Sequence, residues 1–482
     1  MDEIHTFNDS RDNFGGQLKF YQEYPTYLHP PLFFILTHLR FPFPKPERDL
    51  RIIPLIFGIL SVPMIYILAR SFSHAIASFC ALSFTFMAYH IYFSQEGRSY
   101  SMVLFLGMVA LYFFIQHLKT SEKKYLFLTA PVFALLFYTS YSSIPFITFS
   151  QMLWFFQFRG QSQKSSLSSF FILNGLFFLL LMPWLLLVLS NYNGQPIMPP
   201  QHTEDPGPLW DVVYKLLNDW TSNLPLIIVS AILLALFPLF AKQKRQALIL
   251  LTLSLLPIIS VHLFCRSLGI THFFNSRYFI AFLPFFLISI FLSLDSIELK
   301  LKGLGKFIHL KFFFATFLIV SNLVILPLYY RSEKQDLRRL VNYLTGHLRD
   351  GDNIFVGTRA NIPGIFHYLG IYPKDRHHTV SFSKDREKGI EHKIQVAGQH
   401  KTFHIYHSKH CCAQYTADGN RLWIIVDKWM VNQYRKGCPC VLKGYFDGSF
   451  ANINKFPTDA SIYLFLWDPK SPEEKGIDLP IE

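Results

Sequence analysis

Asp2 and Glu3 stand side by side at the start of this sequence and are the first residues whose types could do chemistry. A carboxylate that faces a water-filled cavity can act as a general base on a hydroxyl group. The residue types alone favour a plainer interpretation, which is a solvated N-terminus. Both interpretations stay open at this point.

A second candidate is Arg98, in the segment SQEGRSY at residues 94–100. A guanidinium group binds phosphate through two parallel hydrogen bonds and stays charged, so this arginine could hold a lipid-linked phosphate. An arginine at the end of a membrane helix also commonly extends to the lipid headgroups. The sequence supports these two interpretations equally.

Further candidates lie in residues 265–278, which contain His272, Arg277 and Tyr278. The cationic side chains could join the same site, and the alternative is interfacial anchoring with Tyr278 in an aromatic belt. His29 precedes two prolines and is most simply a residue at a helix start, because proline fits the first turn. The sequence contains no GxGxxG, Walker A, HExxH or GxSxG motif, so nucleotide-dependent and zinc-protease chemistry have no support.

Cysteines cluster in the tail of the chain, which the charge distribution places outside the cytoplasm. Disulfides persist in that compartment and are the favoured interpretation, with free thiols and a zinc site as alternatives. The set lacks the paired CxxC spacing of most structural zinc sites, and its pairing cannot be deduced from sequence. The four residues are Cys411, Cys412, Cys438 and Cys440.

The composition shows what kind of elements must position these residues. The 482 residues are 51% hydrophobic and only 16% charged, whereas an average soluble domain is about 25% charged. This composition excludes a disordered protein, a coiled coil and an ordinary cytosolic enzyme. The apolar residues occur in blocks of the length that a helix needs to cross a bilayer, about 20 residues.

These blocks predict an α-helical polytopic membrane protein with about ten transmembrane helices. The interiors of the blocks contain no Asp, Glu, Lys or Arg, whereas a soluble helical protein would carry a charged face on most helices. The predicted spans are residues 52–69, 75–93, 99–117, 125–141, 143–158, 168–190, 223–241, 246–265, 278–294 and 310–329.

The net charge of +13 follows the topology and does not indicate nucleic-acid binding. With the N-terminus outside, the loops on one side carry thirteen Lys and Arg residues, and the opposite loops carry four. Because cytoplasmic loops are enriched in positive charge, the side with thirteen is the cytoplasm. Residues 1–51, the loop 191–222 and the tail therefore lie outside.

Three domains follow from this orientation. Residues 1–51 form an extracytoplasmic loop with an interfacial helix, and residues 52–330 form the transmembrane domain. Residues 331–482 alternate a helical pattern with short apolar strands and predict a small soluble α/β domain. The loop 191–222 is rich in Pro, Gly and Asn and is predicted to be flexible.

Several segments, in this order, resemble the GT-C glycosyltransferases. The acidic pair is followed by HPPL at residues 29–32 and by an arginine-rich entry to a span at residues 47–54. HIYFSQEGRSY at residues 90–100 resembles the YYSQEARMY turn of the bacterial branch, the glycosyltransferase 39/83 group. This group contains protein mannosyltransferase-like, aminoarabinose transferase-like and lipopolysaccharide galacturonosyltransferase-like enzymes.

Two later segments extend the resemblance. Arg277-Tyr278 with Leu283-Pro284 resembles the RYLLPLLP of this branch, and residues 334–352 resemble the KEDWR…YL…GD that opens its exterior tail. Each motif alone is weak, but together, in this order and with matching topology, they are specific.

The resemblance implies a GT-C fold and an inverting transfer of one sugar from a polyprenyl-phosphate donor. The acceptor would be a lipid, lipopolysaccharide, polysaccharide or protein at the outer face. Asp2 would accept the proton of the acceptor, with Glu3 orienting it, and Arg98 and Arg277 would stabilise the departing phosphate. Some relatives use a divalent metal, but the acidic pair alone is not a persuasive metal site. The residues lining the site would be His29, Tyr100, His272 and Tyr278.

The sequence departs from the family in one respect, because the family has a first membrane helix ahead of the acidic pair and here only Met1 precedes it. We expect that the reading frame starts too late, and the alternative is an inactive truncated homologue. A membrane transporter or flippase is the rival function, although such proteins usually place ionisable residues at the bilayer centre. The expected location is the plasma (inner) membrane.

Overall fold

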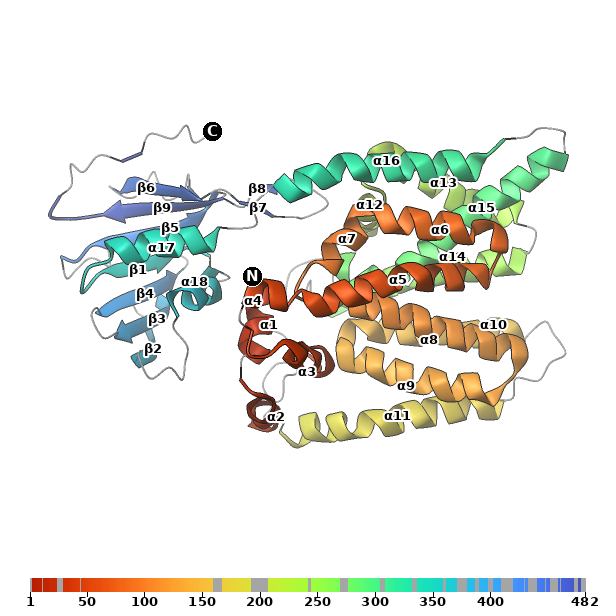
Figure 1. Ribbon diagram of the computed structural model, residues 1–482, viewed down its shortest axis with the longest axis horizontal. Coiled ribbons are helices and arrows are strands. Elements are labelled where there is room, and N and C mark those ends of the chain that lie inside the picture. The colour runs from red at the N-terminus through yellow and green to blue at the C-terminus, as the bar shows by residue number, and fades with distance from the viewer. Residues whose placement is uncertain are drawn as a thin grey trace. The chain divides into compact units, whose positions relative to one another are not determined.

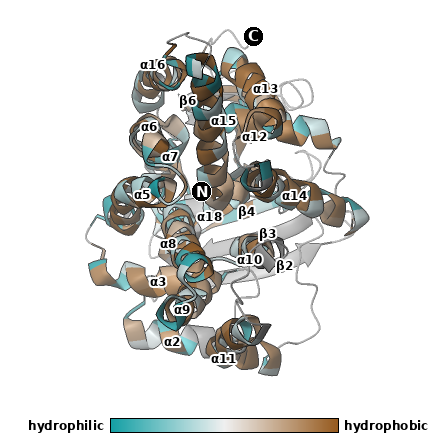
Figure 2. Ribbon diagram, turned by 90° about the vertical axis from the view of Figure 1, so that its right-hand side faces the viewer, coloured by the Kyte–Doolittle hydropathy of each residue, from teal (hydrophilic) through white to brown (hydrophobic). Residues whose placement is uncertain are grey.

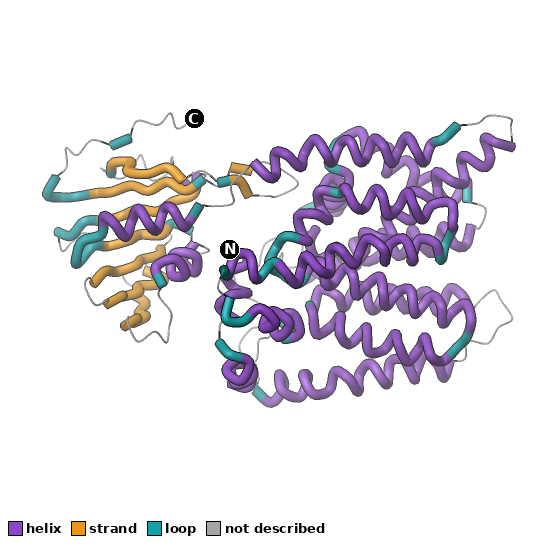
Figure 3. Tube along the Cα trace, in the orientation of Figure 1, coloured by secondary structure: helices purple, strands orange, loops and turns teal. Residues whose placement is uncertain are grey.

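The computed structural model divides the chain into two compact units. One consists of Asp2 and Thr6–Leu326, and the other of Met1, Glu3–His5 and Pro327–Glu482. Figures 1 and 3 show that the first unit is helical and that the strands belong to the second. The structure describes residues 2–10, 12–23, 29–43, 45–158, 167–191, 207–241, 244–268, 276–303, 308–331, 336–358, 361–370, 379–385, 390–397, 402–408, 419–428, 430–431, 440–446, 448–450, 458–459, 461–471 and 476–477.

The N-terminal segment forms a series of short helices. The hydroxyl of Thr37 donates a hydrogen bond of 2.9 Å to the hydroxyl of Ser10, which attaches the first helix to the third. Burial lowers the pKa of His38, and the carboxylate of Asp12 opposes this shift. The helices are α1 (Asp2–Ser10), α2 (Phe14–Glu23), α3 (Leu32–Thr37), η1 (His38–Arg40) and α4 (Pro46–Asp49).

Long apolar helices make up the rest of this unit and are predominantly brown in Figure 2. They are α5 (Ile52–Arg70), α6 (His74–Phe86), α7 (Ala88–Ser94), α8 (Tyr100–Thr120), α9 (Lys123–Thr139), α10 (Ile144–Phe158), α11 (Leu167–Ser190), α12 (Leu209–Thr221), α13 (Leu224–Phe240), α14 (Lys244–Leu268), α15 (Leu283–Gly303) and α16 (Leu310–Arg331). The 3-10 turn η2 (Tyr141–Ser143) precedes α10, and η4 (Ser276–Phe282) leads into α15.

Each of the ten predicted spans coincides with helix. Among the residues that the structure describes, six helices are long and apolar enough to cross a membrane, and eight if each of two bent pairs counts as one span. Two of the ten predicted spans are too short by this measure, namely α9, with 17 residues, and α10, with 15. A helix of 15 residues is about 22 Å long, which is less than the hydrocarbon thickness of about 30 Å.

Burial separates the central helix from the outer ones. The most apolar stretch of residues 276–303, which comprise η4 and α15, is 89% buried, whereas the corresponding stretches of α11 and α16 are each 22% buried. All of these helices are apolar around their whole circumference, which suits both a packed centre and a lipid-facing surface. α15 therefore forms the core against which η4 is placed.

Two predictions for this unit are wrong in detail. The span 75–93 is not one straight helix, because α6 and α7 meet at an angle of 61°. The loop 191–222, predicted to be flexible, contains α12. In α12 the apolar residues Val212, Leu216 and Trp220 recur every fourth position and are buried, a pattern hidden by the overall polarity of the loop.

The second unit is an α/β domain, as predicted. Its sheet has the strand order β2-β3-β4-β1-β5-β9-β6, in which β1 is parallel to β4 and β5 and the remaining pairs are antiparallel. The helices are α17 (Leu337–His347) and α18 (Ile362–Leu369). The strands are β1 (Asn353–Val356), β2 (Thr379–Asp385), β3 (Ile390–Ala397), β4 (Thr402–Ser408), β5 (Leu422–Asp427), β6 (Val441–Phe446), β7 (Ser449–Phe450), β8 (Thr458–Asp459) and β9 (Ile462–Trp467).

Five elements of this domain were not predicted from sequence, namely the short strands β7 and β8, the longer strands β2 and β3, and the helix α18. β2 and β3 mix charged and apolar residues, so neither reads as an apolar run. α18 begins with Ile362-Pro363-Gly364, and a proline followed by glycine is more typical of a turn. The structure shows this proline in the first turn of a helix, where it is tolerated.

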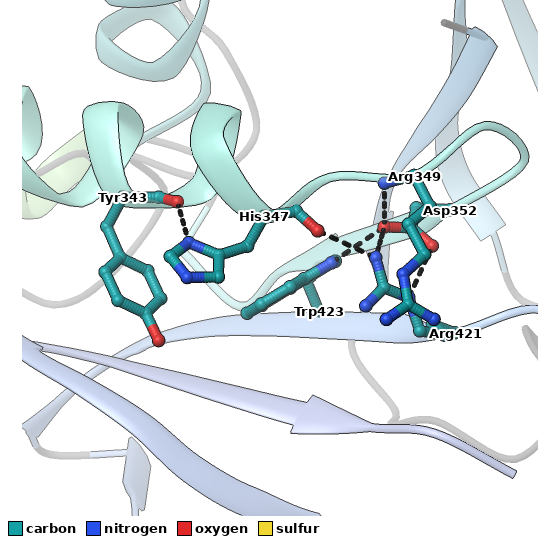
Figure 4. A network of polar contacts seen from close by, with 6 residues as sticks. All are labelled: Tyr343, His347, Arg349, Asp352, Arg421 and Trp423. Atoms are coloured by element: carbon teal, nitrogen blue, oxygen red, sulfur yellow. Dashed lines mark hydrogen bonds and ion pairs between the residues drawn. The ribbon is translucent and has the colours of Figure 1, made fainter. Parts of the chain in front are cut away.

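A buried carboxylate holds the start of β1 (Figure 4). Asp352 is 2% exposed and accepts hydrogen bonds from Arg421 Nε at 3.0 Å and Arg421 Nη2 at 2.6 Å. It also accepts hydrogen bonds from Trp423 Nε1 at 3.0 Å and from the backbone N–H of Arg349 at 2.8 Å. The Gly351-Asp352 pair, matched above to a family motif, therefore has a structural role within the domain.

We expect Asp352→Asn to lower the free energy of unfolding of this domain by about 3 kcal/mol, because it leaves the buried Arg421 without a counter-charge. Hydrogen exchange of the full-length protein in detergent should show lost amide protection in α17 and β1. Asp336→Asn is the matched control, because asparagine still caps α17. Equal protection in the two variants would contradict the prediction.

Candidate functional site

The turn that carries Arg98 lies between α7 and α8 and is packed tightly against α5. Gly58 of α5 faces Ser94 so closely that a β-carbon at residue 58 would lie 2.2 Å from Ser94 Oγ. Glu96 and Gly97 are buried, and the backbone N–H of Arg98 donates a hydrogen bond of 2.6 Å to the carbonyl of Glu96. Glycine at position 58 therefore allows the helix approach that places this turn.

Gly58→Ala should lower the thermal stability of the detergent-solubilised protein, with a cost of about 1–3 kcal/mol for overpacking. Gly175→Ala in α11 is the matched control, because a β-carbon there would meet nothing within 4 Å. The double variant Gly58→Ala/Ser94→Gly should recover most of the loss, since it removes the atoms that collide. An unchanged melting temperature in Gly58→Ala would show that the helices separate at no cost.

Arg277 lies in η4 and stacks against two aromatic rings. Its guanidinium carbon is 5.8 Å from the ring centre of Tyr100 and 5.2 Å from that of Tyr278. Tyr100 is the first residue of α8 and is only 4% exposed. Cations over aromatic faces are attracted by the ring quadrupole, which orients the guanidinium. A guanidinium carries five N–H donors, a number suited to an anionic ligand.

The structure thus brings together three of the residues selected from the sequence, namely Tyr100, Arg277 and Tyr278. They come from the start of α8 and from η4, which pack against each other. Arg98 belongs to the same turn as Tyr100, two residues earlier in the chain, and its side chain is half-buried. A planar, permanently charged group held in this way is suited to binding a phosphate.

The structure describes the other residues selected from the sequence only in part. Asp2 is the first residue of α1, but its side chain lies outside the part of the chain that the structure describes, and so does the whole of His272. Glu3 is half-buried in α1. His29 precedes α3 and is half-buried, with its ring 6.0 Å from that of Phe34.

Residues 28–187 match the family model described as dolichyl-phosphate-mannose-protein mannosyltransferase. The match contains the HPPL motif and the whole turn from α7 to α8. The predicted resemblance to the GT-C glycosyltransferases is confirmed for this segment. The architecture predicted from the sequence is confirmed as well: the chain has an α-helical unit with several helices long and apolar enough to cross a membrane, followed by a small C-terminal α/β domain.

Solved structures of ArnT from Cupriavidus metallidurans are also similar to this chain. The apo structure aligns with 9% sequence identity and a TM-score of 0.38, covering 96% of this chain and 93% of ArnT. The structure of ArnT bound to undecaprenyl phosphate aligns with 9% identity and a TM-score of 0.39, covering 97% and 93%. At this level of similarity no residue of ArnT is matched to a residue here. A search with the whole sequence finds no significant match among curated proteins.

Cysteine pairing and metal binding stay predictions. Cys440 directly precedes β6, is partly buried and packs against the apolar cluster around Phe355. Cys411, Cys412 and Cys438 lie outside the described residues. Within the described ranges, no three or more His, Cys, Asp or Glu side chains are grouped so that they could hold a metal ion.

Two buried polar residues of the membrane unit were not predicted from the sequence. Asp219 lies in α12 and is 2% exposed, and Asn322 lies in α16 and is 1% exposed. Asp219 was hidden in the segment predicted to be a flexible loop. Asn322 carries no charge and therefore did not interrupt the predicted span, although any strongly polar side chain inside a membrane is a signal of function or of helix pairing.

Proposed function

We propose that the protein is a membrane glycosyltransferase that moves one sugar from a polyprenyl-phosphate-linked donor to an acceptor at the outer face of the membrane. The observation that carries this proposal is the mannosyltransferase family match over residues 28–187. The stacked Arg277 supports it, because this side chain can pair with the phosphate of such a donor. The lipid-facing helices give the apolar chain of the donor a place to lie.

The proposed reaction is a single displacement. The hydroxyl oxygen of the acceptor attacks the anomeric carbon of the sugar while the bond from that carbon to the phosphate oxygen breaks. Asp2 accepts the hydroxyl proton, and the polyprenyl phosphate leaves with the bonding electron pair. Negative charge grows on the phosphate, so Arg277 and Arg98 stabilise the transition state more than the ground state. One displacement inverts the anomeric configuration.

The test uses the purified protein in detergent with a radiolabelled polyprenyl-phosphate sugar and a panel of acceptors: a lipid, a lipopolysaccharide, a polysaccharide and a protein. We expect labelled sugar to move to one class of acceptor and to carry the inverted linkage. If the protein binds the donor but transfers sugar to none of the acceptors, the enzymatic function is contradicted and the protein is a donor-binding protein.

A transporter or flippase is the second candidate, and the two bent helix pairs favour it, because broken helices are typical of transporters. Sugar transfer needs no gradient, so transfer in detergent separates the two functions. Movement of labelled lipid across proteoliposomes without transfer would favour the transporter. In the proposed orientation the protein lies in the plasma (inner) membrane, with its α/β domain extracytoplasmic.

A further inference from the structure

The helix pair α6 and α7 is broken directly before Tyr89. α6 ends at Phe86 and α7 begins at Ala88, and the two axes differ by 61°. Such a break frees backbone groups that a continuous helix would pair, and at membrane depth these groups need other partners. The residues that hold the break therefore decide where α7 lies, and with it Tyr89.

Asn322 of α16 holds the start of α7. Its side-chain oxygen accepts a hydrogen bond of 2.8 Å from the backbone N–H of Ala88. The same oxygen accepts a hydrogen bond of 2.9 Å from the hydroxyl of Ser222, the residue that follows α12. The amide group of Asn322 donates a hydrogen bond of 2.7 Å to the carbonyl of Leu318 in its own helix. Asn322 is 1% exposed, so α7 begins at a fixed point inside the unit.

The hydroxyl of Tyr89 reaches from α7 to η4. It donates a hydrogen bond of 2.8 Å to the carbonyl oxygen of Ser276, the first residue of η4. Tyr89 is 0% exposed, so water does not compete for its hydroxyl group. The accepting carbonyl belongs to the peptide group that joins Ser276 to Arg277. The hydrogen bond therefore fixes the backbone from which the side chain of Arg277 extends.

The ring of Tyr89 supports the other side of the same contact. It packs edge-on against Phe93, one turn later in α7, with ring centres 4.7 Å apart. Phe93 packs edge-on against Tyr100, with ring centres 5.0 Å apart. Tyr100 is one of the two rings against which the guanidinium of Arg277 stacks. Tyr89 therefore holds the arginine through its hydroxyl group and the ring of Tyr100 through Phe93.

We propose that Tyr89 is a positioning residue for Arg277. Its hydroxyl group fixes the backbone of the arginine, and its ring supports the aromatic face on which the guanidinium stacks. Because Tyr89 is buried, it acts on the reaction only by setting where the guanidinium lies. A functional group must be held within about 0.5 Å of its productive position. This inference rests on the proposed function, because it takes Arg277 as the group that binds the donor phosphate.

The test is a double-mutant cycle in the full-length protein in detergent, with binding of undecaprenyl phosphate as the measurement. Tyr89→Phe removes the hydroxyl group and keeps the ring that packs on Phe93. We expect it to weaken binding about fivefold in the otherwise unchanged protein, the usual effect of losing one hydrogen bond. In the Arg277→Ala protein, which keeps the weak binding of the apolar lipid chain, the same change should weaken binding less than about twofold.

Two controls separate positioning from general stability. Tyr138→Phe removes the same kind of hydrogen bond, which runs 2.9 Å from the hydroxyl of Tyr138 in α9 to the carbonyl of Leu180 in α11 and involves no residue of η4. It should leave binding unchanged, and a loss equal to that of Tyr89→Phe would contradict the inference. Replacement of Tyr89 by para-aminophenylalanine keeps a group that can donate to Ser276 and should restore most of the binding.

Hydrogen exchange measures the positioning without the lipid. The amides of η4 should exchange faster in Tyr89→Phe than in the unchanged protein, because their first peptide group has lost its support. In Tyr138→Phe they should exchange at the unchanged rate. Faster exchange throughout the helical unit of Tyr89→Phe would indicate a general loss of stability and would overturn the inference.

Equal weakening of binding by Tyr89→Phe in both backgrounds would also overturn the inference, because the two residues would then act independently. Unchanged binding in Tyr89→Phe would overturn it as well. In either case the proposed function survives if the unchanged protein binds undecaprenyl phosphate and Arg277→Ala weakens that binding. If the unchanged protein neither binds this lipid nor transfers sugar, the proposed function falls, and the inference falls with it.

Discussion

Asp2→Asn should lower the rate of sugar transfer by about 10³-fold, because an amide cannot accept the proton of the attacking hydroxyl. The loss should appear in kcat and leave the binding of the donor lipid within a factor of about two, since the base acts in the transition state. The measurement is a steady-state assay with a polyprenyl-phosphate sugar, together with binding of undecaprenyl phosphate.

Asp12→Asn is the matched control for this variant. Asp12 is an exposed carboxylate in the same N-terminal segment, and its replacement should leave transfer unchanged. Full activity of Asp2→Asn in a preparation where Arg277→Ala is inactive would remove the base assignment and keep the glycosyltransferase. Another carboxylate would then have to take the proton.

Arg277→Ala should lower transfer by about 10²- to 10³-fold, the usual effect of removing one group that stabilises developing negative charge. Donor binding should weaken too, because the same guanidinium pairs with the phosphate before reaction. Arg277→Lys keeps the charge but loses the planar group that stacks on Tyr100 and Tyr278, so an intermediate loss is expected. Kinetics and lipid binding of the two variants check this order.

The control for Arg277 is Arg266→Ala, which removes an exposed arginine at the end of α14. We expect unchanged transfer in this variant. If Arg277→Lys is as inactive as Arg277→Ala while both still bind the lipid, the arginine acts on the sugar and not on the phosphate. If neither substitution changes transfer, Arg98 becomes the principal phosphate ligand.

The sequence alone determined the helices of the membrane unit and the class of the protein. An apolar run of about twenty residues in lipid must satisfy its own backbone groups, and a helix is the local way to do so. The positions of the predicted spans therefore did not depend on distant contacts. The motif that contains Arg98 could also be recognised from the sequence, because its residues are adjacent in the chain and match a family pattern.

Part of the candidate site was predicted as well, but by resemblance and not by geometry. Tyr100, Arg277 and Tyr278 were selected separately, and nothing in their spacing showed that the guanidinium lies between the two rings. β2 and β3 escaped prediction for a similar reason. Their pairing in the sheet, and not an apolar pattern, holds them as strands.

The tertiary structure decided where the membrane helices break and what the breaks position. The N–H of Ala88 can remain without a partner in its own helix because Asn322, 234 residues later, accepts its hydrogen bond. The burial of Asp219 can be recognised only from the packing of α12 in the folded unit. Hydrogen bonds between distant segments depend on packing that no local pattern encodes, whereas helix formation in lipid depends on each segment alone.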